Sequence, residues 1–190
     1  MVDIIELGVD DKLVSNNISD SGTSGLWGEK HAAVDKADDQ IHIACSIAPT
    51  IGGCTAWGYL ANEFKVEGSG EEWCSISSSI YYNGFIGSAV GGTAKITIKF
   101  IVEDLGTGET WDETQFEESL TDVYNRNDYS GTDIESVNVL LKAGRTYRAT
   151  VEAKAETSSF GTGGALSDWG SKDDGSQYID AKHYGFDFQG

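Results

Sequence analysis

The chain is poor in cysteine, in basic residues and in long apolar runs, and each shortage excludes a class of protein. No stretch of about 18 apolar residues occurs, so we expect no transmembrane helix and no membrane insertion. Thirteen Lys and Arg stand against 31 Asp and Glu, and the resulting net charge of −18 repels polyanions. Nucleic acid is therefore not expected as a partner.

Cysteine occurs only at Cys45, Cys54 and Cys74. The odd number excludes a complete intramolecular disulfide framework. Two interpretations stay open: one bridge with a free thiol, as in an extracellular protein, or buried thiols that act as small apolar side chains. The first residues, MVDIIELGVDD, lack the basic region and apolar stretch of a signal peptide. We therefore expect either a mature secreted domain or a virion component assembled inside a cell.

Sequence motifs of common catalytic sites are missing as well. Neither the nucleophile elbow Gly-x-Ser-x-Gly nor a Walker A loop occurs, and the three histidines lack zinc-site spacing. Glu71 and Glu72 beside Trp73 would suit a glycoside hydrolase, but adjacent residues of a strand point to opposite faces. The sequence favours a non-enzymatic protein, and a glycan-active enzyme is the third hypothesis.

Apolar residues alternate with polar ones along most of the chain. In residues 147–156, Tyr147, Ala149 and Val151 alternate with Arg148 and Thr150, although many residues there are good helix formers. Similar patterns occur at 41–47, 95–102 and 184–188, with further candidates at 56–66, 73–82 and 134–141. Glycine pairs and Asn83-Gly84 separate these runs and indicate turns. We expect an all-β fold, a single antiparallel β-sandwich of about seven to nine strands over residues 40–190.

The first 39 residues have a different character. Residues 2–9 suit one strand, whereas residues 15–39 are polar, glycine-containing and aperiodic. We expect residues 1–39 to form an N-terminal arm that contributes at most one strand. The arm would either pair with the sheet edge of a neighbouring subunit or fold back on its own domain.

The segment LLKAGRTYRATV, residues 140–151, resembles the tyrosine corner of immunoglobulin-like and fibronectin type III-like sandwiches. Leu141, Gly144 and Tyr147 match the family pattern, and Ala143 stands where proline is usual. The resemblance implies that the Tyr147 hydroxyl bonds to upstream backbone where the chain crosses between strands. It concerns about a dozen residues and implies an architecture only.

A looser resemblance extends from SISSSIYYNG through KITIKFIVEDLGTGET to GGALSDWG. These stretches are similar in style and strand order to uncharacterised acidic β-sandwich proteins of archaea and their viruses. The resemblance implies an exported or virion-borne domain and names no activity.

Five tryptophans are candidates for ligand stacking. Trp57 and Trp73 fall in expected strands, where burial in the core is the simpler interpretation. Trp27, Trp111 and Trp169 fall in expected loops, where they are either buried or exposed for contact with sugars or another protein. We take these three as the candidate ligand-binding residues.

Two segments rich in oxygen ligands, 125–135 and 167–180, make calcium the candidate cofactor. Neither segment has EF-hand spacing, and a solvated acidic loop is the alternative interpretation. The candidate metal ligands are Asn125, Asn127, Asp128, Asp133, Asp173 and Asp174.

These observations favour a non-enzymatic structural or adhesive β-sandwich of a virion or extracellular surface assembly. Its expected partners are other copies of the chain or other structural proteins. The alternative is a secreted carbohydrate-binding module with structural calcium and a glycan as its partner.

Overall fold

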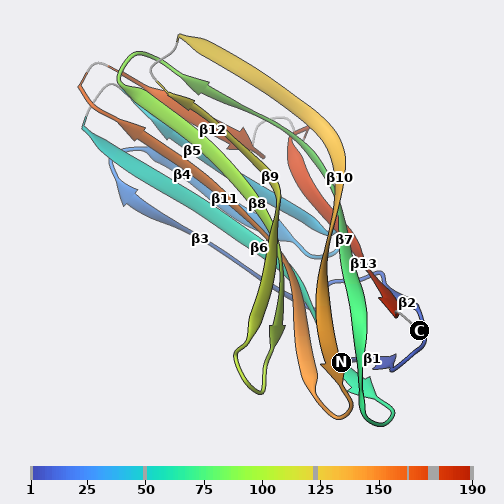
Figure 1. Ribbon diagram of the computed structural model, residues 1–190. Helices are drawn as coiled ribbons and strands as arrows, with labels where there is room; N and C mark the ends of the chain where they lie inside the picture. The colour runs from blue at the N-terminus through green and yellow to red at the C-terminus, as the bar shows by residue number, and fades with distance from the viewer. Residues whose placement is uncertain (1, 49–50, 122–123, 162, 171–175, 189–190) are drawn as a thin grey trace.

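The computed structural model describes residues 2–48, 51–121, 124–161, 163–170 and 176–188, which form two β-sheets packed face to face (Figure 1). Within this part of the chain there is no helix of a length and hydrophobicity that would span a membrane. The strands are β1 (Asp3–Glu6), β2 (Asp11–Leu13), β3 (Ile18–Leu26), β4 (Glu29–Asp35), β5 (Gln40–Ile47), β6 (Gly52–Glu67), β7 (Glu71–Ser88), β8 (Gly92–Asp104), β9 (Thr110–Thr121), β10 (Asn125–Lys142), β11 (Thr146–Ser159), β12 (Ala165–Trp169) and β13 (Tyr178–Phe188). The expected all-β sandwich is confirmed.

Each sheet has a simple order. The first sheet runs β1-β6-β11-β8-β9, with β3 beside β6, and the second runs β10-β7-β12-β5-β13-β2, with β4 beside β5. Pairings between the described strands are antiparallel except that of β1 with β6. Nine strands, β5 to β13, lie within residues 40–190, at the upper limit of the expected number.

Two expectations about local structure are corrected. Asn83 and Gly84 do not form a turn but lie within β7. Gly84 is required there because an added Cβ would lie 2.4 Å from Cε3 of Trp169. Glycine in the middle of a strand often marks such a close approach. Residues 125–135, expected to form a loop, belong to β10.

The N-terminal segment is built into both sheets. Strands β1 and β3 pair with β6, β2 pairs with β13, and β4 pairs with β5. Ile5 is fully buried, and the Asn16 amide donates hydrogen bonds to Asp39 Oδ1 and to the carbonyl of Ala181, both at 2.8 Å. Tyr184 donates to Asn16 Oδ1 at 2.8 Å. In this structure the segment folds back on its own domain with four strands, and pairing with a neighbouring subunit stays a prediction.

The core lies between the sheets, where alternate residues of each strand meet. Tyr147 is fully buried, and its hydroxyl accepts a hydrogen bond from the backbone N–H of Lys142 at 3.0 Å. Gly144 makes the turn with a φ of 83°, a conformation that glycine adopts readily, and Leu141 is buried beside it. The bond from Tyr147 therefore fixes the β10–β11 corner.

The three cysteines divide into a bridge and a free thiol. Cys45 of β5 and Cys54 of β6 form a disulfide, which joins the second sheet to the first. Cys74 is free and buried, and burial raises the pKa of its thiol to about 12. Its thiol is therefore protonated near neutral pH and a poor nucleophile.

The outer faces of the two sheets differ in chemistry. The first sheet carries cross-strand ion pairs, among them Lys99 with Asp112 at 2.8 Å and Lys95 with Glu117 at 2.9 Å. On the outer face of β7 in the second sheet, Ser75, Ser77 and Ser79 alternate with core residues. The middle of β7 therefore gives the second sheet an uncharged polar stretch on its outer face, and the candidate site lies on the same face.

Candidate functional site

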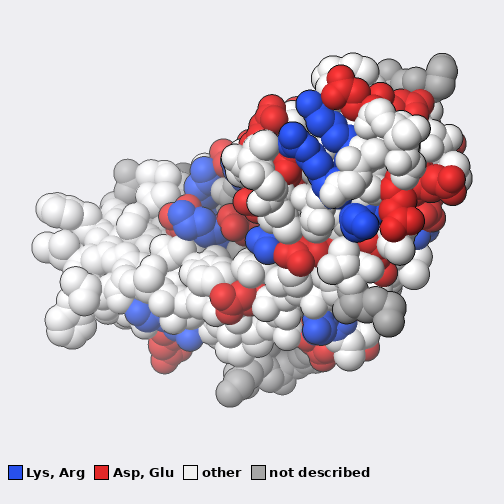
Figure 2. Space-filling model, turned by 90° about the horizontal axis from the view of Figure 1, so that it is seen from below, with Lys and Arg blue, Asp and Glu red and all other residues white. Residues whose placement is uncertain are grey.

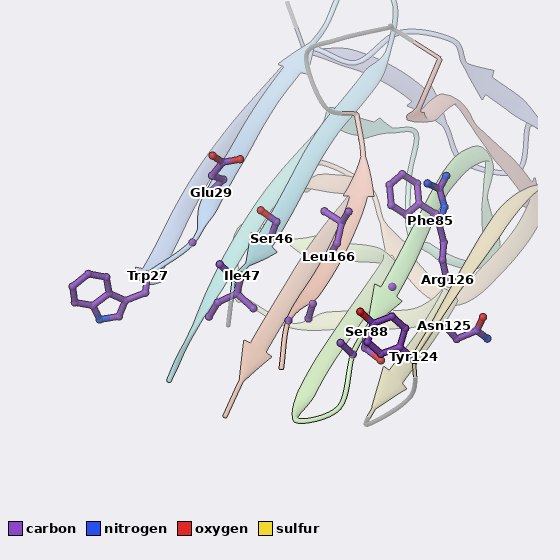
Figure 3. Close-up of a pocket in the computed structure, with 16 residues that line it drawn as sticks. Trp27, Glu29, Ser46, Ile47, Phe85, Ser88, Tyr124, Asn125, Arg126 and Leu166 are labelled. Carbon is purple, nitrogen blue, oxygen red and sulfur yellow. The ribbon is translucent and has the colours of Figure 1, made fainter. Parts of the chain in front are cut away.

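A broad groove of about 1150 Å³ lies on the outer face of the second sheet (Figure 3). It crosses β4, β5, β12, β7 and β10 near the ends of these strands. With strands about 4.8 Å apart, four inter-strand steps give a groove of about 19 Å across the sheet. That length suits an extended ligand of several units.

One residue from each of the five strands lies in a single row across the groove. The strand register places Glu29 opposite Ser46, Ser46 opposite Leu166, Leu166 opposite Gly87, and Gly87 opposite Arg126. Residues that face each other in this way share one side of the sheet. Gly87 has no side chain, so the row is lower between Leu166 and Arg126.

Aromatic side chains stand at both ends of the groove. Trp27 lies in the turn between β3 and β4 and is 72% exposed, and Tyr124 precedes β10 and is 91% exposed. In Figure 3 Trp27 lies at the far left of the strands, and Tyr124 lies toward the right, near Ser88 at the end of β7. Both rings are free to stack on a bound molecule.

Arg126 lies on the β10 side of the groove and is the one Lys or Arg among the residues that line it. The Arg126 guanidinium lies 3.6 Å from the centre of the Phe85 ring. It also donates two hydrogen bonds to Asp128 Oδ1, at 3.0 and 2.7 Å. Arg126 and Asp128 thus form an exposed ion pair at this side of the groove, and the Arg126 side chain is 56% exposed.

The three candidate tryptophans are not brought together. Trp27 lines the groove, Trp111 is half-buried on β9 of the first sheet, and Trp169 is fully buried. The Trp169 ring packs 5.7 Å from Phe116 and 6.2 Å from Tyr129, between the sheets. A ring enclosed in this way cannot stack on a ligand, so the expectation for Trp169 is corrected: it ends β12 with its side chain turned inward.

The candidate metal ligands are also dispersed. Because β10 alternates, Asn125, Asn127 and Asp133 point to one side of the strand and Asp128 to the other. Within the described residues, no three His, Cys, Asp or Glu side chains come together in a way that would hold a metal ion. Asp173 and Asp174 lie outside the described residues. Calcium therefore stays a prediction.

A smaller pocket of about 240 Å³ lies further along the same face. Tyr81, Tyr178, Asp180 and His183 line it, and the rings of Tyr81 and Tyr178 are 5.6 Å apart. Burial and the nearby Lys12 lower the pKa of His183, so its imidazole is neutral at physiological pH. With Tyr81 and Tyr178 it adds a second aromatic-lined hollow to the same face.

Sequence reasoning named two residues of the groove, Trp27 as a ligand-binding residue and Asn125 as a metal ligand, and missed Phe85, Tyr124, Arg126 and Leu166. The missed residues belong to three segments, β7, β12 and the start of β10, that the strand register brings together. The exposed aromatic Tyr124 between two strands was the one local signal available.

Comparisons with known proteins give only distant likenesses. No protein-family model matches the chain, and no curated protein matches it. Among solved structures, it is similar to a family 35 carbohydrate-binding module from Clostridium thermocellum at 11% identity and a TM-score of 0.28, covering 92% of this chain and 97% of the other. A loop-swap mutant of Xyn11A from Necallimastix patriciarum is similar at 10% identity and a TM-score of 0.37, with 95% of each chain covered.

A third likeness is to the enzymatically active domain of tailspike protein 4 of bacteriophage CBA120, at 13% identity and a TM-score of 0.26. It covers 86% of this chain, which spans 19% of the length of the tailspike chain. Identities and TM-scores this low establish no common function, so the site is interpreted from its own geometry.

Proposed function

We propose that this chain is a non-enzymatic adhesive domain that binds neutral glycans in the groove of the second sheet. The observation that carries the proposal is the row Glu29, Ser46, Leu166, Gly87 and Arg126, which runs between two exposed aromatic rings. Sugar rings present apolar C–H faces to aromatic side chains and hydroxyl groups to polar ones. The groove offers both.

The charge of the protein selects neutral ligands. The net charge of −18 repels acidic sugars, and Arg126 is already neutralised by Asp128. Glu29 is the carboxylate of the row, and it would further disfavour a uronic acid or a sialic acid. A neutral oligosaccharide meets none of these penalties.

An extracellular or virion surface is the proposed location. The Cys45–Cys54 disulfide supports it, because disulfides persist in oxidising environments and are rare in the cytosol. The Tyr147 to Lys142 hydrogen bond supports the related proposal of a tyrosine corner like that of immunoglobulin-like sandwiches, which are frequent on surfaces.

Isothermal titration calorimetry with a panel of neutral and acidic oligosaccharides tests the function. We expect at least one neutral oligosaccharide to bind and its acidic counterparts to bind more weakly. Trp27→Ala and Tyr124→Ala should each weaken binding about tenfold, since each removes a stacking ring. Repeating the titration after chelation tests whether calcium supports the site.

The matched control is Trp73→Ala. Trp73 is 54% exposed on the same sheet but lies near the start of β7, far from the groove. Its loss should leave binding unchanged. Equal losses in all three variants, or no binding to any neutral sugar, would contradict the proposal.

Self-association is a second proposal. Strand β10 has 18 residues and, among the described strands, pairs only with β7, so its other edge is open to a further strand. Acidic residues along it, including Asp128 and Asp133, oppose pairing with another copy. Light scattering of the native chain at low and high salt measures whether screening permits assembly.

A further inference from the structure

The connections between strands at one end of the sandwich are apolar, and their described residues carry no charged side chain. Large apolar side chains project there from five separate connections between strands. They define the apolar tip: Leu26, Trp27, Ile51, Val90, Tyr124 and Phe160, each at least 65% exposed. This end is at the upper left in Figure 1 and at the left in Figure 2, where the visible face shows no Lys, Arg, Asp or Glu at its extremity.

Contacts between the connections hold them together. The N–H of Phe160 donates to the carbonyl of Gly91 at 2.7 Å, and that of Ala89 donates to the carbonyl of Gly164 at 2.8 Å. An added Cβ at Gly52 would lie 3.4 Å from the Trp27 ring. These contacts join the β7–β8 connection to the β11–β12 connection and place Gly52 beside Trp27.

Such exposure is unusual in a chain of net charge −18. The largest exposed apolar patches of soluble proteins mark surfaces that bind something. A protein partner is normally oriented by placed charges and hydrogen bonds, and the described residues of these connections carry no charged side chain to supply them. Asp122, in the connection before Tyr124, lies outside the described residues.

We propose that the apolar tip rests on the surface of a neutral lipid bilayer. Trp and Tyr prefer the boundary between headgroups and acyl chains, and Trp27 and Tyr124 share the tip with the aliphatic Ile51 and Val90 and the ring of Phe160, all of them exposed. Side chains on separate loops enter a fluid medium without needing a complementary surface. A zwitterionic surface also avoids the repulsion that anionic lipids would exert on the acidic body.

This surface is distinct from the groove, although Trp27 and Tyr124 border both. Ile51, Val90 and Phe160 do not line the groove. Replacing these three by Ser removes half of the six side chains of the tip and leaves the glycan-binding residues in place. The two proposals can therefore fail separately.

Flotation with phosphatidylcholine vesicles tests the proposal. We expect the native chain to float with the vesicles and the Trp27 emission to shift to shorter wavelength. The triple variant Ile51→Ser, Val90→Ser and Phe160→Ser should lower the bound fraction at least about tenfold while keeping its glycan affinity. Adding anionic lipid should weaken binding at low salt.

The matched control replaces three exposed aliphatic residues near the other end, Ile4→Ser, Val9→Ser and Val14→Ser. It should float like the native chain. A native chain that stays soluble, a tip variant that floats normally, or binding that requires anionic lipid would overturn the proposal. A dimer that forms without vesicles and is lost in the tip variant would also overturn it and assign the tip to a second copy.

Discussion

Gly84 shows how one residue without a side chain shapes the interior. It lies in the middle of β7, and the Trp169 ring occupies the space that a side chain would need. Around Trp169 the rings of Tyr82, Phe116 and Tyr129 form an aromatic cluster between the sheets. The strand register places this cluster three residues along the strands from the row that crosses the groove, so its packing supports the sheet next to the site.

Gly84→Ala should lower the free energy of unfolding by about 1 to 3 kcal/mol, because the added methyl group forces the Trp169 ring or the β7 backbone to move. Gly87→Ala is the control, since its nearest neighbour would be 3.5 Å away. Urea denaturation followed by tryptophan fluorescence measures both. Similar stabilities of the two variants would show that the ring shifts without cost.

At the scale of elements, the β8–β9 turn depends on a buried carboxylate. Asp104 is 2% exposed, its Oδ1 accepts the N–H of Gly106 at 2.8 Å, and its Oδ2 forms an ion pair with Arg145 of the neighbouring corner. Burial by itself raises the pKa of Asp104, but the Arg145 guanidinium and the turn N–H groups outweigh it, and the pKa is lowered. The Asp104 carboxylate therefore links the β8–β9 turn to the β10–β11 corner.

The lowered pKa of Asp104 determines how the stability of the fold depends on pH. A carboxyl whose folded pKa is below its unfolded value of about 3.9 stabilises the fold above that value and loses the contribution as pH falls through the folded pKa. Asp104→Asn should therefore cost about 1 to 2 kcal/mol at pH 7, and the difference should shrink below about pH 4. Asp112→Asn, in an exposed pair with Lys99, is the control and should cost less than about 0.5 kcal/mol. Denaturation at several pH values measures the free energy of unfolding of each variant. A difference between Asp104→Asn and the native chain that does not change with pH would contradict the stabilising role of the ion pair.

Elements with a strict alternation of apolar and polar residues were predictable, because one face of each is buried. Strand β11 is such a case, and the Leu141, Gly144 and Tyr147 pattern also indicated its corner. Strand β9 was missed because its outward positions are acidic and a register shift opposite Ile98 and Lys99 interrupts its period. The groove was not predictable, since it depends on the alignment of Glu29, Ser46, Leu166, Gly87 and Arg126, and no local pattern specifies that register.

At the scale of the whole molecule, the N-terminal strands are part of the folded unit. Deleting residues 1–38 removes β1 to β4, uncovers the β6 edge and leaves the Tyr184 hydroxyl without Asn16. We expect the shortened chain to lose cooperative unfolding, as measured by circular dichroism on heating. Asn16→Ala, a milder change, should cost about 1 to 3 kcal/mol. A truncated chain that melts like the native protein would show that these strands are an accessory.

The two ends of the described chain meet far from the groove and the apolar tip. Strand β1 and the end of β13 lie at the lower right in Figure 1, where the N–H of Phe188 donates to Asp10 at 3.0 Å. Anything attached at either terminus, such as a stalk, a bead or a sensor chip, would leave the groove and the apolar tip facing outward at the opposite end of the sandwich. The protein can therefore be attached through either terminus without the attachment covering the groove or the apolar tip.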